Sequence, residues 1–243
     1  MGKYYIRPIP ITKGPRDRSM FTGLYHGQAI DSVKYIWLIE GAGQKVLVDA
    51  GQTAQGYMPR EKKEERNIQS PGEGLGKLGL SPRDIDIVIL THMHYDHMAL
   101  ASEYTRAKFV VQKAELDFGR NPHPVRAHSY DHKLWEPLPL DVVEGDKQII
   151  DGIRVLLTPG HTVGGQSVAV DTPRGVAIIT GFCCTADCFN TPPEMKARGL
   201  QVGPLSLFTN AYQLYDSALK VKQSADIILA NHDQSFIDKP RVP

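Results

Sequence analysis

The segment THMHYDH, residues 91–97, concentrates side chains that bind metal ions: His92, His94, Asp96 and His97. In an extended or turning segment, His92 and His94 point to the same side and can chelate one ion together. Asp96 and His97 follow and can face a second ion beside the first. Imidazole and carboxylate ligands suit zinc, and also iron or manganese. The chain has nine histidines, so a chance cluster of three within six positions is improbable, and the segment predicts a metal site.

The apolar segment Ile85–Leu90 runs directly into this motif and is predicted to be a strand that holds it rigidly. Helices are expected from Lys113 to Phe118 and over Asn210–Lys222, where apolar residues recur at helical spacing. Because strands dominate and no linker divides the chain, we expect two packed sheets with helices outside, as one domain over residues 1–243. Further strands are expected at Lys34–Glu40, Gln44–Asp49, Phe109–Gln112, Val142–Gly145, Gln148–Ile150, Ile153–Thr158, Gln166–Asp171, Val176–Thr180 and Ile227–Ala230.

Two long segments interrupt these elements. Gln52–Leu80 contains PREKKEER, a charge run that predicts a solvated helix or loop, with a lid over a site as the alternative. Gly119–Pro139 holds several prolines and histidines and is predicted to be an irregular loop near a pocket. Arg126 in this loop is either solvated or able to bind an acidic substrate.

Four stretches of the sequence resemble the metallo-β-lactamase fold superfamily. HMHYDH matches its HxHxDH signature, and KVLVDAGQ is similar to its early strand with an Asp-Gly pair. LLTPGHTVGGQSV resembles the segment that carries a lone metal-binding His, here His161, and ILANHD resembles the segment that ends in the last one, here His232. The resemblance covers roughly residues 30–235. DIVILTHMHYDH, FVVQKAEL and VVEGDKQIIDGIRVLLTPGHT are most similar to the N-acyl-homoserine lactonase group.

The resemblance implies an αββα sandwich of two mixed sheets with helices on the outer faces. It implies a dinuclear site, with two Zn²⁺ ions expected and iron or manganese as alternatives. One metal would be held by His92, His94 and His161, and the other by Asp96, His97 and His232. Each added histidine follows a predicted strand, in agreement with the pattern read from the residues.

Two adjacent cations can acidify a shared water to hydroxide and polarise a carbonyl, which is the chemistry of hydrolysis. Asp96 is the predicted catalytic residue, orienting the water or carrying a proton to the leaving group. A GxSxG elbow and a P-loop do not occur in the sequence, and the glycine-rich stretches GQTAQG and GEGLGKLG are interpreted as turns. We therefore expect a zinc-dependent hydrolase that opens a small lactone or ester through a metal-bound hydroxide.

One expected ligand is missing. The resemblance implies an Asp that bridges both metals, seven residues before an Asn; counting back from Asn190 reaches Cys183. Three interpretations remain open: the Cys183 thiolate is the bridge, Asp187 reaches in from the loop, or only water joins the metals. Cys184 would point to the opposite face of a continued strand, and Cys188 is, like it, expected to be a small buried apolar residue.

A second departure concerns a Tyr that the lactonase group places near the substrate carbonyl. That position is Ala186 in this chain. Tyr25, Tyr57 and Tyr130 are candidates to take the role, without a preference among them.

The composition narrows the choice of partners. The net charge is +1, from 28 basic and 27 acidic residues, so nucleic acid and anionic membranes are not expected partners, and a small-molecule substrate is. The N-terminal segment has no apolar region typical of a signal peptide, and no apolar run is long enough to span a membrane. Three clustered cysteines do not form a disulfide framework, so we expect the cytoplasm. A homodimer is one option for the oligomeric state.

Rival functions share the predicted site. Hydrolysis of a cyclic amide or thioester needs the same metals. The superfamily also includes iron enzymes that act on persulfides or oxygen, and the altered bridge raises the option of a binding protein that has lost activity.

Overall fold

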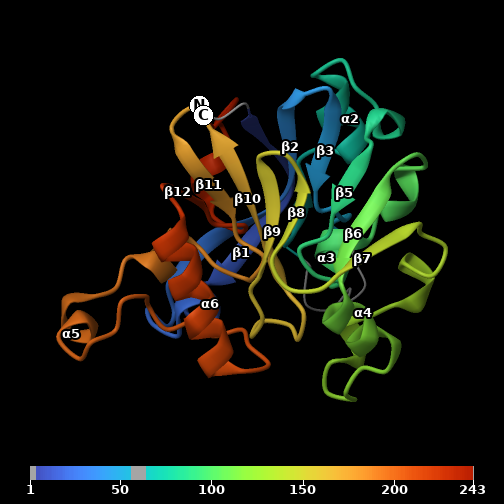
Figure 1. The fold of residues 1–243 in the computed structure, drawn as a ribbon. Coiled ribbons are helices and arrows are strands. Elements are labelled where there is room, and N and C mark those ends of the chain that lie inside the picture. Colours follow the sequence, from blue (N-terminus) through green and yellow to red (C-terminus); the bar gives the residue numbers. More distant parts are fainter. Residues whose placement is uncertain (1–3, 56–63, 243) are drawn as a thin grey trace.

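Two β-sheets pack face to face in the computed structural model, which describes residues 4–55 and 64–242 (Figure 1). The strands are β1 (Tyr5–Asp17), β2 (Ala29–Ala42), β3 (Gln44–Val48), β4 (Arg66–Asn67), β5 (Ile87–Ile89), β6 (Lys108–Gln112), β7 (Leu140–Val143), β8 (Lys147–Ile150), β9 (Ile153–Leu157), β10 (Gln166–Thr172), β11 (Gly175–Ile179) and β12 (Ile227–Leu229). The α-helices are α1 (Ser19–Thr22), α2 (Pro71–Gly76), α3 (Tyr95–Met98), α4 (Lys113–Arg120), α5 (Pro193–Lys196) and α6 (Ala211–Ser224).

Both sheets are mixed, as predicted. The first has the order β4-β1-β2-β3-β5-β6-β7, in which β3, β5, β6 and β7 run parallel. The second has the order β12-β11-β10-β9-β8, in which β12 is parallel to β11 and the other pairs are antiparallel. In the first sheet, the carboxyl ends of the parallel strands therefore meet at one edge.

The main core lies between the sheets. Trp37 and Val110 of the first sheet share one buried cluster with Val168 and Ile179 of the second. Complete burial of an aliphatic side chain stabilises a fold by about 1.5–3 kcal/mol. The apolar runs that identified the strands thus also account for the contact between the layers.

Helices cover the outer faces. Figure 1 shows α2 beside the first sheet and α6 beside the second. Leu75 of α2 and Leu116 of α4 pack in the core cluster on the outside of the first sheet, and Leu214 and Val221 of α6 pack in the cluster on the outside of the second. Helix α6 begins after Asn210, whose side-chain oxygen accepts hydrogen bonds from the backbone N–H groups of Tyr212 and Gln213 in the first turn. The predicted αββα sandwich is confirmed.

The strands predicted from the sequence are present with shifted ends, but β1 was missed. Its segment contains Pro8, Pro10 and Pro15, which argue against a strand because proline donates no hydrogen bond. Strand β4 pairs with β1 on the side opposite β2 and has only two residues, so most of β1 has a free edge on that side. The backbone nitrogens of the prolines can point to this edge, where a missing hydrogen-bond donor leaves no partner strand unpaired. A bulge between Pro10 and Thr12 shifts the register to accommodate the third proline.

The two long segments fare differently. Residues 59–63 of the predicted charge run, and Tyr57, lie outside the described residues, so the lid prediction cannot be placed. Gly119–Pro139 is irregular, as predicted, with short 3₁₀ turns at Ala127–Ser129 and His132–Leu134. No helix among the described residues is long and apolar enough to cross a membrane.

Candidate metal centre

The predicted ligands lie where strands of both sheets end. His92 follows β5, and Asp49, which is not one of the predicted ligands, follows β3 directly. His161 lies in the loop after β9, and His232 follows β12. In sheets with parallel strands, functional side chains gather beyond the carboxyl ends because the loops there converge. Both layers therefore contribute to one place.

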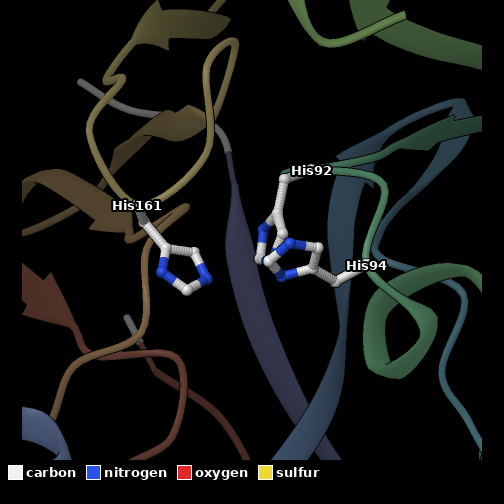
Figure 2. Close-up of side chains that lie close together, drawn as sticks. All are labelled: His92, His94 and His161. Atoms are coloured by element: carbon white, nitrogen blue, oxygen red, sulfur yellow. The ribbon is translucent and has the colours of Figure 1, made fainter. Parts of the chain in front are cut away.

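His92, His94 and His161 form the first group. Each offers one nitrogen, and these atoms lie within 4.8 Å of one another. Figure 2 shows His92 and His94 leaving the segment after β5 and His161 approaching from the opposite loop, with the rings turned toward a shared space. The ring centroids of His92 and His94 are 4.7 Å apart, and those of His94 and His161 are 5.1 Å apart.

Asp96, His97 and His232 form the second group, whose ligand atoms also lie within 4.8 Å of one another. Asp96 and His97 are in the four-residue helix α3, and the Asp96 Oδ2 atom is 3.6 Å from Nε2 of His97. The rings of His92 and His97 are 4.0 Å apart between centroids, so the two groups adjoin. The six residues are brought together in the same two sets that the sequence predicted.

Hydrogen bonds hold the rings in place. Nδ1 of His161 lies 2.7 Å from the Leu207 carbonyl oxygen, and Nδ1 of His92 lies 3.1 Å from the Thr91 hydroxyl. In metal sites, such a partner on one imidazole nitrogen fixes the tautomer that presents the other nitrogen to the ion. Among the described residues, His92 Nε2 and His232 Nδ1 are buried without a protein hydrogen-bond partner. Buried polar atoms need a partner, and a metal ion at each group supplies one, so the residues fit the predicted metals.

The charge states suit metal binding. Burial, reinforced by neighbouring histidines, lowers the pKa of His92 well below its ordinary value; burial also lowers the pKa of His232. Burial lowers the pKa of His161 to about 4. These rings are neutral at pH 7, as a metal ligand must be. At His97 burial opposes the charged form, but Asp49 and Asp96 outweigh it, so the pKa of His97 is raised.

Asp49 was not identified as a site residue from the sequence. It has a left-handed backbone with φ of 61°, and Oδ1 accepts a 2.8 Å hydrogen bond from the Thr91 backbone N–H. Its Oδ2 atom lies 2.7 Å from Nδ1 of His97. A non-glycine residue in this conformation at a site is a strained position held by its surroundings. The VDAG sequence after an apolar strand was the available signal.

Glu115 was also missed, because it lies in α4, away from the motif. Its buried carboxylate accepts hydrogen bonds from the Met93 N–H at 3.0 Å and the Gly164 N–H at 2.9 Å. Tyr130 donates its hydroxyl to the same carboxylate at 3.0 Å. Met93 lies between two predicted ligands and Gly164 follows His161 closely, so Glu115 joins the two ligand-bearing loops.

The cysteine segment does not continue as a strand, because β11 ends at Ile179. Cys183 lies at the wall of the cavity beside the predicted ligands and is 9% exposed. Cys184 and Cys188 are fully buried in the core beneath α6, as predicted. Asp187 is bound by Arg18 through two contacts of 2.8 Å and, unlike Cys183, is not among the described residues that line the cavity, which argues against the Asp187 alternative.

The tyrosines offered in place of the one missing at Ala186 are otherwise engaged. The Tyr25 ring lies 3.9 Å beneath the Arg18 guanidinium carbon, and the Tyr130 hydroxyl is bound to Glu115. Neither is among the described residues that line the cavity. The backbone N–H of Ala186 donates to Asp233. A tyrosine role near the substrate carbonyl is therefore not supported for Tyr25 or Tyr130, and Tyr57 lies outside the described residues.

A cavity of about 470 Å³ opens onto both groups. Met20, Phe21 and Leu207 give it an apolar side. Its wall also includes three cations: Arg16, Lys34 and Arg126. Of these, the sequence offers a substrate-binding role, as one of two alternatives, only for Arg126. Arg16 and Lys34 lie in segments whose pattern indicates strands and turns and gives no sign of a site.

Comparisons with known proteins agree with the fold. The model of the metallo-beta-lactamase superfamily matches residues 30–181, more than half of the chain. An N-acyl homoserine lactonase of Bacillus thuringiensis is 23% identical over 230 residues, covering 88% of this chain and 87% of the relative.

Solved structures resemble this one at lower identity. An N-acyl homoserine lactone hydrolase with N-hexanoyl-L-homoserine bound at its catalytic metal centre has a TM-score of 0.71 and 22% identity, over 96% of this chain and 94% of that one. A dizinc quorum-quenching lactonase with a bound product has a TM-score of 0.67 and 18% identity, over 98% and 88% of the two chains. The chain therefore belongs to the metallo-beta-lactamase superfamily.

Proposed function

We propose that this protein is a hydrolase that opens a small lactone or ester at a two-metal site, with zinc as the metal. The observation that carries the proposal is the pair of three-residue ligand groups that adjoin one cavity. His92, His94 and His161 would hold one ion, and Asp96, His97 and His232 the other. Relatives named as N-acyl homoserine lactonases support the lactone or ester class, and a structural neighbour named as a dizinc lactonase supports zinc.

When bound, two divalent cations supply Lewis acidity for a carbonyl and acidify a water molecule. The chain positions the reactants around them. Asp96 is about a quarter exposed toward the cavity, so one carboxylate oxygen can bind metal while the other orients water or carries a proton to the leaving alcohol. Phe21 and Leu207 exclude water from the apolar side, which strengthens the electrostatic interactions within the site.

We propose that the Cys183 thiolate takes the place of the expected Asp that bridges the two metals. Cys183 lines the cavity onto which both ligand groups open, and it belongs to neither group of three ligand atoms. In the protein without metal, burial raises the pKa of this thiol above its ordinary value. A metal ion next to the sulfur would reverse this, because a coordinating thiol is deprotonated. The remaining alternative is that water alone joins the metals.

We further propose that residues 1–243 act as one domain, because the ligand groups draw on both sheets. The three free thiols support the cytoplasm as the compartment.

Zinc-loaded protein should be assayed against a panel of lactones, esters, thioesters, cyclic amides and β-lactams, with metal content measured in parallel. We expect turnover of a lactone or ester that His92→Ala and His232→Ala both abolish. An absence of turnover with the whole panel, in protein shown to hold two zinc ions, would refute the proposal. Stoichiometric iron with uptake of oxygen would point to the redox class.

A further inference from the structure

Among the described residues, the wall of the cavity beside the metal centre holds more cationic than anionic side chains. The described residues that line it include Arg16, Lys34 and Arg126, against one carboxylate, that of Asp96. Asp96 is itself a predicted metal ligand. A site for a wholly neutral substrate gains nothing from cations in its wall, and burying them is costly.

Two of these cations are built into the fold behind the cavity. Lys34, in β2, is 5% exposed, and its Nζ atom lies 3.3 Å from Oε1 of Glu65. Arg16, in β1, donates from Nη2 to the other oxygen of Glu65 at 2.5 Å. Both side chains therefore start from neighbouring strands and meet at a carboxylate that is completely buried.

The same carboxylate is fixed by neutral groups. The Thr12 hydroxyl donates to Glu65 Oε1 at 2.7 Å, and the Gln52 amide nitrogen donates to it at 2.6 Å. Glu65 is thus held in one position, which holds the two cations in turn. A carboxylate between two cations balances one of them, so the network of Arg16, Lys34 and Glu65 carries one positive charge in excess.

This network lies next to the second ligand group. Arg16 and Lys34 line the same cavity as His97 and His232, and Arg126 lines it together with His94 and His161. Arg126 is half-buried in its loop, and Nη2 donates to the Phe208 carbonyl at 2.9 Å. Arg16 and Lys34, which are fixed by the buried Glu65, are therefore the more rigid pair among the cations that line the cavity.

We infer that the substrate carries a free carboxylate in addition to the bond that is cleaved, and that Arg16 and Lys34 bind it. Guanidinium and ammonium groups form charge-assisted hydrogen bonds with a carboxylate, and a preorganised cation in a partly desolvated wall binds more strongly than one in water. The Ser32 hydroxyl, 3.3 Å from Lys34 Nζ, adds a polar group to the same wall. This inference rests on the proposed hydrolase function and narrows its substrate to acidic esters or lactones. In the reaction, water gives OH to the acyl carbon and H to the leaving oxygen, and the second carboxylate is unchanged.

Two esters with acyl chains of equal length test for recognition of a carboxylate separately from hydrolysis itself. Phenyl pentanoate and the phenyl monoester of glutaric acid share a leaving group and differ in a terminal methyl against a terminal carboxylate. With zinc-loaded wild-type protein we expect the acidic ester to have a kcat/KM about tenfold or more above the neutral one, the size expected for a charge-assisted hydrogen bond. Equal values, or a preference for the neutral ester, would overturn the inference and leave the hydrolase intact.

Variants of Lys34 and Arg16 test whether these two residues bind the carboxylate of the substrate. Lys34→Met should reduce the ratio of the two kcat/KM values to near one, and Lys34→Arg should retain most of it. Because Lys34→Met leaves Glu65 with one cation and can impair folding, Arg16→Gln, at a more exposed side chain, provides a second test of the same charge. Lys13→Met is the matched control, since Lys13 lies on the same strand as Arg16 but pairs with Asp31 at 3.5 Å away from the cavity lining. A preference that survives both Lys34→Met and Arg16→Gln, or that Lys13→Met removes equally, would overturn the assignment.

A binding measurement does not depend on turnover. Calorimetry of zinc-loaded protein should show glutarate binding about tenfold more tightly than pentanoate, with the difference lost in Lys34→Met and Arg16→Gln. If neither these esters nor any compound of the panel is hydrolysed but this difference in binding is present, the assignment of Arg16 and Lys34 as carboxylate-binding residues stands and the hydrolase proposal fails. Equal affinities for glutarate and pentanoate would refute the inference that Arg16 and Lys34 bind a carboxylate of the substrate.

Discussion

Oδ2 of Asp49 lies 2.7 Å from Nδ1 of His97, which joins the end of β3 to the short helix that carries two predicted ligands. The same carboxylate accepts the Thr91 N–H, and the side-chain amide of Asn231 donates to it at 3.4 Å. Asp49 thus contacts the segments that lead to both His92 and His232. A carboxylate behind a ligand histidine fixes its orientation and increases its basicity.

Asp49→Asn should weaken metal binding at the second group selectively. The amide cannot supply the negative charge that raises the pKa of His97, and its NH₂ group can face a donor. Loss of such a partner costs roughly 10- to 100-fold in metal affinity. Metal analysis after dialysis against a weak chelator should fall from two ions toward one per chain. Asp31→Asn, on the surface beside Lys13, should keep both ions; equal losses in the two variants would contradict the role of Asp49.

Cys183→Ala should lower metal content or activity sharply, because it removes the group at the expected bridge. Cys188→Ala is the matched control: it lies in the core and should change stability by about 1 kcal/mol while leaving the metals in place. In cobalt-substituted protein, the wild type and Cys188→Ala should show sulfur-to-metal charge transfer in the near ultraviolet, and Cys183→Ala should not. The same spectrum in all three proteins would leave water as the joining group.

Glu115→Gln should loosen the two ligand-bearing loops. The carboxylate accepts from N–H groups of both loops, and an amide that keeps one of these contacts turns its NH₂ group toward a donor at the other. An unsatisfied buried group costs about 1–3 kcal/mol. The free energy of unfolding in urea should fall by that amount, and the metals should exchange faster. Glu136→Gln, at an exposed glutamate, is the control and should leave both quantities unchanged.

The metal-free protein should lose stability as the pH falls from about 6.5 toward 4. The folded-state pKa of His161 is lowered to about 4, so in this window the unfolded chain binds a proton that the folded chain does not. One such group changes the free energy of unfolding by up to about 1.4 kcal/mol per pH unit, and the lowered pKa values of His92, His94 and His232 act in the same direction. The raised pKa of His97 gives stability that is fully present below about pH 6.5 and is lost only at higher pH, so it does not alter the slope in this window. The raised pKa of Glu115 acts in the opposite direction.

Urea unfolding at a series of pH values measures this slope. His161→Asn removes one of the titrating groups and should flatten the curve between pH 6 and 5. An identical slope in the variant and the wild type would show that His161 does not titrate as its burial implies.

Much of this architecture could be read from local patterns. The apolar runs located most strands because burial on both faces of a layer needs continuous apolar sequence, as at Ile87–Ile89. The spacing of His92, His94, Asp96 and His97 identified the first ligands because neighbours in sequence remain neighbours in space. His161 and His232 could be added by resemblance.

The residues that hold the ligands and the cavity wall in place could not be predicted from local sequence patterns. Glu115, Glu65 and Lys34 act through contacts with residues far away in sequence, and no local pattern distinguishes them from surface charges. Asp187 shows the reverse: its nearness in sequence to Cys183 made it a candidate, but Arg18, from the other end of the chain, holds it elsewhere. The prolines of β1 hid a strand that only its place at the sheet edge permits.

Each ligand group takes residues from both layers of the sandwich: the segment after β5 belongs to the first sheet, whereas His161 and His232 follow strands of the second. An ion held by such a group is a cross-link between the two sheets, made after the chain has folded around it. The free energy of metal binding then adds directly to the resistance of the layers to separation, through mass action. Metal supply, as well as temperature, would set how long the folded protein survives.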